Sequence, residues 1–275
     1  MEFTAIEKAW IPYALLVAVE LAALLGYLFY GRHRKAAIVI ATAGLLCFFP
    51  FKNWFEAREK KAYAEEAWAH FRKLCEEKAG EKIYKSFDRV RSVLIEKPLP
   101  MATEKDSYDQ YWYGDPYSAE IHGRRGVLEA AVLAIPNAPI SRGKSGRGFD
   151  FVEVRISGST MDSNSSIDRV FYPEGAERYS QVASARSVSR FSIAWEDISS
   201  PKDRKYWVAG SRLVIFDKLE NIVVAERIGF FIESGFGSTA GQRRPWMASK
   251  GSNTTCPYSH TWSDRMFVLK VLSPD

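Results

Sequence analysis

The sequence predicts an α+β protein, in which an N-terminal transmembrane helical hairpin is followed by an amphipathic helix that packs on a mainly antiparallel β domain. Three observations predict this fold. Two apolar runs open the chain, an amphipathic helical pattern follows them, and short apolar segments bounded by turn residues fill the remainder. No helix-length amphipathic run separates those short segments, which disfavours a parallel sheet. We therefore expect three parts, at residues 1–52, 53–80 and 81–275.

The first part predicts two membrane spans, at about residues 10–30 and 36–51. A helix needs roughly 20 apolar residues to cross the core of a bilayer. The first run has that length, whereas the second is shorter and needs tilt or snorkelling flanks to cross. A cleaved signal peptide is disfavoured because the start lacks a basic segment, the apolar run is too long and a second run follows at once. A retained hairpin would leave both chain ends on one side of the membrane.

The charges beside the spans indicate which side the β domain occupies. The loop between the spans carries Arg32, Arg34 and Lys35 and no acid, so the positive-inside rule places it in the cytoplasm. Basic residues just after the second span oppose that assignment. Weighed together, the charges on the two sides favour a β domain outside the cytoplasm. In a Gram-negative bacterium that compartment is the periplasm, and the chain would be held in the inner membrane.

The cysteines favour the same compartment. Of the three, Cys47 lies in the second predicted span, so Cys75 and Cys256 are the two in the soluble part. In an oxidising compartment they form a natural disulfide pair, which would join the start of the domain to its end. The alternative is two unrelated thiols, since free cysteine is often buried. The chain has no Cys-x-x-Cys motif, which excludes a zinc ribbon or a thioredoxin-type site.

Inside the first predicted span, small residues recur at every fourth position, at Ala14, Ala18, Ala22 and Gly26. Such a stripe lets a second helix approach closely. Glu20 points away from the stripe, because a helix turns by about 100° per residue. An intramembrane carboxyl is costly, so Glu20 is a candidate contact to a partner protein. The alternative is that a very apolar helix tolerates one carboxyl.

The second and third parts are predicted from periodicity. Apolar residues recur at helical spacing from Asn53 to Lys78, and Gly80 is the expected stop. A five-residue loop, Asp217–Asn221, suits a β-hairpin. The predicted strands are Val90–Ile95, Val127–Ile135, Phe149–Ile156, Arg190–Ile198, Arg212–Phe216, Ile222–Ile232 and Met266–Leu272.

Catalytic motifs are weak. Gly143-Lys144-Ser145 resembles the end of a P-loop, but Ala138 stands where that motif needs its first glycine, which favours a solvated hairpin loop. Ser141-x-x-Lys144 and Ser199-x-x-Lys202 match the spacing found in penicillin-binding enzymes, but the partner motifs of those enzymes are missing.

The net charge of +5 is mild and does not indicate nucleic-acid binding without a concentrated patch.

The histidines do not build a predicted site either. His122 and His260 could share one with Asp115 or Asp264, as a metal centre or an acid–base pair requires. Nothing in the sequence brings these residues together, so scattered surface histidines are the favoured interpretation. We therefore predict no enzymatic activity, no cofactor and no metal.

The aromatic tract Asp106–Tyr117 is the predicted partner-binding segment. Tyrosine and tryptophan give large contact area at low entropic cost, and the three acids among them suit a basic partner. The alternative is an irregular loop whose rings pack on the sheet. The candidate residues are Tyr108, Tyr111, Trp112, Tyr113, Asp115 and Tyr117.

Two segments carry a family resemblance. The stretch from Cys75 to Phe87 and the closing Phe267-Val-Leu-Lys-Val-Leu-Ser-Pro274 resemble uncharacterised proteobacterial envelope proteins. Members of that group are similar to proteins found beside type VI secretion effectors, where immunity proteins are encoded. The resemblance covers the two ends of the soluble part and assigns no catalytic residue. It implies a bacterial source, a periplasmic domain and toxin neutralisation.

Two functions of different class follow. The first is a non-enzymatic, inner-membrane-anchored periplasmic binding protein, such as an immunity protein that neutralises a secreted toxin. The second is an accessory subunit of an envelope secretion or conjugation assembly, recruited through its transmembrane spans. Both need the lipid bilayer and a protein partner. A hydrolase would require a buried polar pocket near His122 or His260.

Overall fold

The structure is a computed structural model of the 275-residue chain. It describes residues 17, 20, 21, 34–97, 104–112, 125–135, 138–140, 144–146, 148–156, 166–247, 251–257 and 263–274. The chain forms two compact units, Met1–Glu65 and Glu66–Asp275. Helix α2 (Arg34–Glu77) begins in the first unit and ends in the second.

The predicted membrane hairpin, residues 1–52, falls in the first unit. Within the described residues, no helix is both long enough and apolar enough to cross a membrane. The first predicted span, at about 10–30, lies outside those residues apart from Val17, Glu20 and Leu21. The side chains of the second, at 36–51, lie outside them too, although its backbone is helical. The hairpin therefore stays a prediction.

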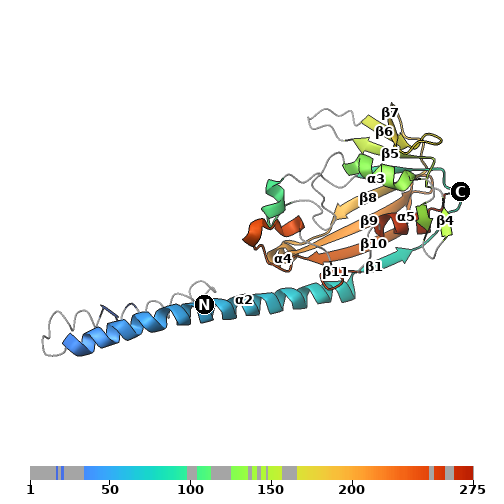
Figure 1. The fold of residues 1–275 in the computed structure, drawn as a ribbon. Coiled ribbons are helices and arrows are strands. Elements are labelled where there is room, and N and C mark those ends of the chain that lie inside the picture. Colours follow the sequence, from blue (N-terminus) through green and yellow to red (C-terminus); the bar gives the residue numbers. More distant parts are fainter. Residues whose placement is uncertain are drawn as a thin grey trace. The chain divides into compact units, whose positions relative to one another are not determined.

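The second unit is built on a nine-stranded, mainly antiparallel sheet, as predicted (Figure 1). Its strands run in the order β1-β10-β9-β8-β2-β5-β6-β7, and β11 also pairs with β10. Their bounds are β1 Gly80–Ile83, β2 Ser92–Lys97, β5 Phe151–Ile156, β6 Ser166–Phe171, β7 Ser180–Ser184, β8 Phe191–Asp197, β9 Val208–Asp217, β10 Ile222–Ile232 and β11 Thr255–Cys256. A separate hairpin pairs β3 (Ala138–Ile140) with β4 (Lys144–Gly146).

The sheet also contains parallel pairs, which the sequence had disfavoured. β2 lies parallel to both of its neighbours, so that Ile95 is opposite Val154 on β5 and Ile193 on β8. The connection from β2 to β5 includes α3 (Arg125–Ala134), a helix in a segment predicted as the strand Val127–Ile135. That prediction was wrong because a short, continuously apolar run has no periodicity that separates a helix from a strand.

The last predicted strand, Met266–Leu272, is also wrong. The segment forms helix α5 (Ser263–Val271), and five of its side chains, Arg265, Phe267, Val268, Leu269 and Val271, are at most 4% exposed. A helix that is buried on several sides has no clear apolar stripe, so its helical period is not visible in the sequence.

The main core lies between α3, α5 and one face of the sheet. Val152, Ile193 and Ile215 from the strands meet Ala130 of α3 and Phe267 of α5 in one buried cluster. Because side chains alternate along a strand, Val208 of β9 faces away from this cluster. On that second face, a smaller cluster of buried residues holds the end of α2.

The helix predicted from Asn53 belongs to α2, which starts at Arg34 and ends at Glu77. Gly80 opens β1 with a φ of 148°, a conformation that glycine adopts readily and other residues rarely do. Residues 271–273, near the C-terminus, bond to the segment that follows β1. Phe87 donates its amide to Val271 at 2.8 Å and accepts the amide of Ser273 at 2.8 Å.

The predicted hairpin Asp217–Asn221 is tighter than expected, because Asp217 still pairs with Ile222 and residues 218–221 form the turn. Asp217 is fully buried and accepts hydrogen bonds from Arg190, Leu219 and Glu220. The bond from Arg190 is the main reason why the pKa of this carboxyl lies below its usual range. The buried carboxylate of Asp217 thus holds the backbone of the turn in place.

Candidate functional site

The described part of the aromatic tract forms a loop, residues 104–112, which we call the aromatic loop. Its centre is a single 3₁₀ turn, η2 (Lys105–Tyr108). Ser107 is buried at the base of the turn and donates its hydroxyl to the carbonyl of Glu104 at 2.6 Å. The amide of Asp109 closes the turn on the carbonyl of Asp106 at 3.1 Å. This loop therefore has a defined internal structure.

Contacts with two other segments, residues 204–205 and 244–246, hold the aromatic loop in place. The indole N–H of Trp246 donates to the carbonyl of Asp109 at 2.7 Å. The side-chain amide of Gln110 donates to the carbonyls of Arg204 and Lys205, each at 2.9 Å. At the start of the loop, Arg244 forms an ion pair with Glu104. These bonds fix the loop backbone at both ends.

A buried aromatic cluster lies beneath these attachments. Trp246, in the 3₁₀ turn η4 (Pro245–Met247), is 1% exposed, and its ring lies 5.2 Å from that of Trp207 and 6.4 Å from that of Phe231. The guanidinium of Arg204 lies 5.3 Å from the centre of the Trp246 ring and pairs with Asp197 at 2.6 Å. The aromatic loop thus rests on a part of the sheet that is itself well packed.

The tyrosines of the aromatic loop are exposed rather than packed on the sheet. Tyr108 is 41% exposed and Tyr111 is 58% exposed, while Trp112 is half-buried. The other three candidates, Tyr113, Asp115 and Tyr117, lie outside the described residues. The acids are partly engaged, because Asp109 accepts the amide of Tyr111 at 2.9 Å. The described half of the predicted surface is therefore a fixed loop that presents two large rings.

The residues singled out as possible catalytic groups have structural partners where they are described. Asp264 accepts the indole N–H of Trp195 at 3.2 Å and also pairs with Arg227. The hydroxyl of Ser199 accepts the amide of Gly210 at 2.8 Å. His122, His260 and Ser141 lie outside the described residues. Among the residues that the structure describes, no group of three or more metal-binding side chains is found.

One ionisable cluster was not visible in the sequence. His70 of α2 forms a hydrogen bond of 2.6 Å with Asp203 of helix α4 (Pro201–Lys205), although the two are 133 residues apart. Asp203 also accepts the amide of Ser200 at 2.6 Å, as part of a capping box. Burial would raise the pKa of Asp203, but the bonds from Ser200 and His70 outweigh it and hold that pKa below its usual range.

Tyr206 and Glu66 extend this cluster. The ring of Tyr206 lies 5.3 Å from that of His70, and its hydroxyl donates to Glu66 at 3.3 Å. Burial and the nearby Glu66 carboxylate raise the pKa of Tyr206, so its hydroxyl stays protonated at neutral pH. Both oxygens of Asp203 already have partners. The arrangement connects α2 to α4.

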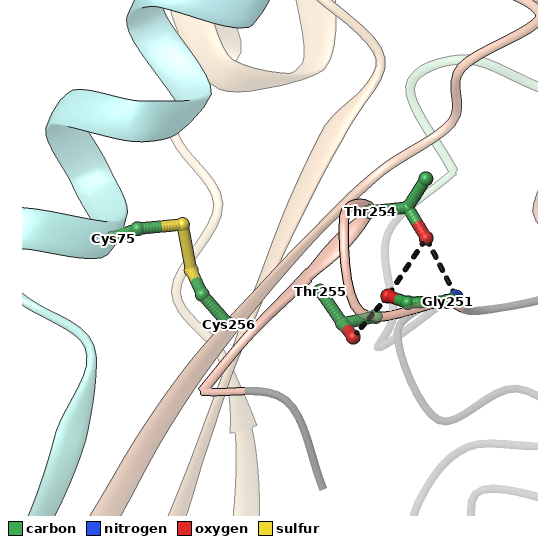
Figure 2. Close-up of a disulfide and its surroundings, with 5 residues drawn as sticks. All are labelled: Cys75, Gly251, Thr254, Thr255 and Cys256. Atoms are coloured by element: carbon green, nitrogen blue, oxygen red, sulfur yellow. Dashed lines mark hydrogen bonds between the residues drawn. A yellow bond between two sulfur atoms is a disulfide. The ribbon is translucent and has the colours of Figure 1, made fainter.

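Figure 2 shows that Cys75 and Cys256 are joined by a disulfide. Their Cα atoms lie 5.7 Å apart, and 181 residues separate them in sequence. The bond connects α2 to β11, which pairs with β10 through Cys256 and Phe230. The preceding turn is ordered by Thr254, whose hydroxyl accepts the amide of Gly251 at 2.8 Å.

Glu20, the intramembrane candidate, is helical and half-buried, with exposed Val17 and Leu21 beside it. The other residues around it in sequence lie outside the described part of the chain. Its predicted role at a partner helix is therefore not tested.

Comparison of this chain with protein-family models, with curated proteins and with solved structures finds no match in any of the three.

Proposed function

We propose that this chain is a non-enzymatic binding protein, anchored in the bacterial inner membrane with its globular unit in the periplasm, and that it neutralises a secreted toxin as an immunity protein. The aromatic loop carries the proposal. Tyr108 and Tyr111 are exposed on a backbone that Trp246 and Gln110 hold in place. Large rings on a preorganised loop lose little entropy on binding and are typical of the residues that dominate protein interfaces.

Two further observations support this proposal. The disulfide between Cys75 and Cys256 favours an oxidising compartment such as the periplasm. Polar groups that could perform chemistry, including Asp264, Ser199 and Asp203, are engaged in bonds that hold the fold. This engagement favours a binding role over catalysis.

The test uses the proteins encoded beside the gene for this chain. Each is produced with an export signal in a test bacterium, with and without the full-length chain. We expect one of them to stop growth, and the chain to restore growth and to bind that toxin after purification. Replacing both Tyr108 and Tyr111 with alanine should weaken binding by about 30-fold or more, because truncating a hot-spot ring costs about 2 kcal/mol.

Tyr84→Ala provides the matched control. Tyr84 is 60% exposed on another part of the unit, where its hydroxyl donates to Glu226. Truncating it removes a ring of the same kind without touching the aromatic loop, so protection should persist. If no neighbouring protein is toxic, or if the aromatic-loop variant protects as well as the unchanged chain, the proposal fails.

The second candidate, a subunit of an envelope assembly, rests on Glu20. A carboxyl in an apolar helix is costly and suits a partner helix with a basic or polar group. Exchanging residues 1–52 for an unrelated hairpin distinguishes the two functions. The exchange should leave toxin binding intact and should abolish recruitment to an assembly.

A further inference from the structure

The strand order of the nine-stranded sheet, in which the short β11 also pairs with β10, begins at β1 and ends at β7, and β1 is the protected end. It is four residues long and carries two charged side chains with partners. Glu81 pairs with Arg227 at 3.6 Å and with Lys270 at 3.2 Å, and Lys82 pairs with Glu226 at 3.6 Å. Short length and charged side chains are the usual means by which proteins prevent another strand from pairing with an edge.

β7, at the other end of the sheet, lacks this protection. Its sequence, Ser-Gln-Val-Ala-Ser, contains neither a charge nor a proline, and its three central residues are exposed. Val182 is 55% exposed. In the part of the chain that the structure describes, β6 is the only strand that pairs with β7. The backbone N–H and C=O groups of such an edge can pair with a further strand.

The β7 edge is also well ordered. All five of its residues pair with β6, from Ser180 opposite Phe171 to Ser184 opposite Ile167. The side-chain amide of Gln181 donates to Asp168 on β6. An edge that is already straight and fixed requires little reorganisation when a strand is added.

The segment after β7 is held by a buried carboxylate. Glu153 of β5 is 0% exposed and accepts the hydroxyls of Ser187 at 2.6 Å and Ser189 at 2.8 Å, as well as the amide of Val188 at 3.1 Å. Burial would raise the pKa of Glu153, but the bonds from Ser187, Ser189 and Arg169 outweigh it and hold that pKa below its usual range. Val188 itself is 61% exposed on this fixed segment.

The charges at the two ends of β7 select the occupant. Arg178 and Arg186 are exposed on either side of the strand. Antiparallel pairing of all five residues with a second copy sets Val182 opposite Val182. Continuing that register into the bends that flank the strand brings Arg178 next to Arg186 at both ends, with Glu177 beside each Arg178. Like charges directly opposite each other destabilise a strand pair, which disfavours a second copy. A strand with a carboxylate at each end would complement both arginines.

We infer that β7 binds an extended segment of a partner protein, which adds a tenth strand to the sheet and carries acidic residues on both sides of a short uncharged core. This goes beyond the proposed function, because β7 and the aromatic loop are different elements and either could bind without the other.

The probe is a synthetic peptide, acetyl-Glu-Asp-Thr-Val-Thr-Val-Thr-Asp-Glu-amide, and its control replaces the four acids with lysine. Both are added to the full-length chain in a mild nonionic detergent at low salt. Hydrogen exchange reports on residues 180–184, and fluorescence anisotropy gives the affinity. We expect the acidic peptide to slow exchange there and to bind about tenfold more tightly than the lysine peptide, because it gains two exposed ion pairs that the lysine peptide cannot form.

Four variants make the inference falsifiable. Arg178→Glu with Arg186→Glu should reverse the preference between the peptides, and Val182→Lys should weaken binding of both. Leu219→Lys introduces the same charge at a residue that is 76% exposed in the β9–β10 turn, and should bind as the unchanged chain does. Tyr108→Ala with Tyr111→Ala should also bind normally, which separates this surface from the aromatic loop. Unchanged exchange at 180–184, or a preference that survives the charge reversal, overturns the inference.

Discussion

Helix α2 contains two stretches that are stabilised in different ways. The outer stretch, residues 52–65, has mostly exposed side chains and two ion pairs between residues four apart, Lys52–Glu56 and Lys61–Glu65. The docked stretch, residues 66–77, buries Ala67, Phe71 and Leu74 against Val208, Phe230 and Ile232 of the sheet. It also carries His70 and Cys75, which bond to α4 and β11.

The difference teaches that one continuous helix can depend on local interactions at one end and on tertiary packing at the other. Ion pairs between residues four apart stabilise a helix by only about 0.2–0.5 kcal/mol each. Burial of one large apolar side chain contributes about 1.5–3 kcal/mol. Mutations in the docked stretch should therefore affect the globular unit, and mutations in the outer stretch should not.

The largest expected effect comes from the disulfide. Replacing Cys75 and Cys256 with serine should lower the free energy of unfolding by about 4–5 kcal/mol in the chain-entropy treatment, because the bond closes a very long loop. Urea unfolding followed by tryptophan fluorescence measures this change. Cys47→Ser is the control, since Cys47 is predicted to lie in a membrane span, and it should leave the midpoint unchanged. An equal midpoint for both changes would contradict the role given to the bond.

Phe71→Ala should have the next largest effect. Phe71 is 4% exposed, and removing a buried phenylalanine ring typically costs about 3–5 kcal/mol. Phe55→Ala removes the same ring from the outer stretch, where the residue is only half-buried, and should change the unfolding midpoint of the globular unit little. Similar losses from the two variants would show that the stretches do not differ as described.

Asp203→Asn should have a moderate effect. The change removes the charge that holds His70 and weakens the cap of α4, so we expect a loss of about 1–3 kcal/mol. Asp88→Asn, at an exposed position, is the matched control and should be neutral. The two unfolding curves are compared at neutral pH.

The same pair of variants tests a pH dependence. The pKa of Asp203 is lower in the folded state than in the unfolded chain. Its ionised form therefore stabilises the folded state fully above the unfolded pKa of about 3.9. That contribution is lost as the pH falls through the lowered folded pKa. Asp203→Asn should therefore cost less stability in acid than at neutral pH. A cost that stayed constant down to strongly acidic pH would contradict the ionised state of this carboxyl.

Lys61→Ala should have the smallest effect. Lys61 and Glu65 are largely exposed, and their charged atoms lie 3.9 Å apart. Losing the pair should reduce helix stability by at most about 0.5 kcal/mol, and added salt should remove even that difference. Circular dichroism of the two proteins at low and high salt is the measurement.

The sequence predicted the parts of the fold that have a clear period. The strands from Phe149, Arg190 and Ile222 correspond to β5, β8 and β10, because alternating or long apolar runs bounded by turns are distinctive. α3 and α5 were missed because their short apolar stretches, Val127–Ile135 and Met266–Leu272, show no period that separates a helix from a strand. β6 and β7 were missed because Ser166–Phe171 and Ser180–Ser184 are short and partly polar, and they depend on pairing with neighbours.

For the candidate site, the sequence identified side chains but not their surroundings. The aromatic tract was recognisable from composition alone. The sequence did not reveal that Trp246 bonds to this tract or that Gln110 bonds to α4. These contacts join segments up to 137 residues apart. The bond between His70 and Asp203 was hidden for the same reason. Only the three-dimensional fold brings such pairs together.

The return of the C-terminus to Phe87 has a consequence for how the protein is made. The amide of Val90 donates to the carbonyl of Ser273, so the segment between β1 and β2 is completed by residues at the very end of the chain. β1 likewise needs β10, its partner from the last quarter of the sequence. A ribosome must therefore reach residue 273 before this unit can close. Until then residues 87–90 and β1 lack these native partners and depend on the cell's chaperones for protection.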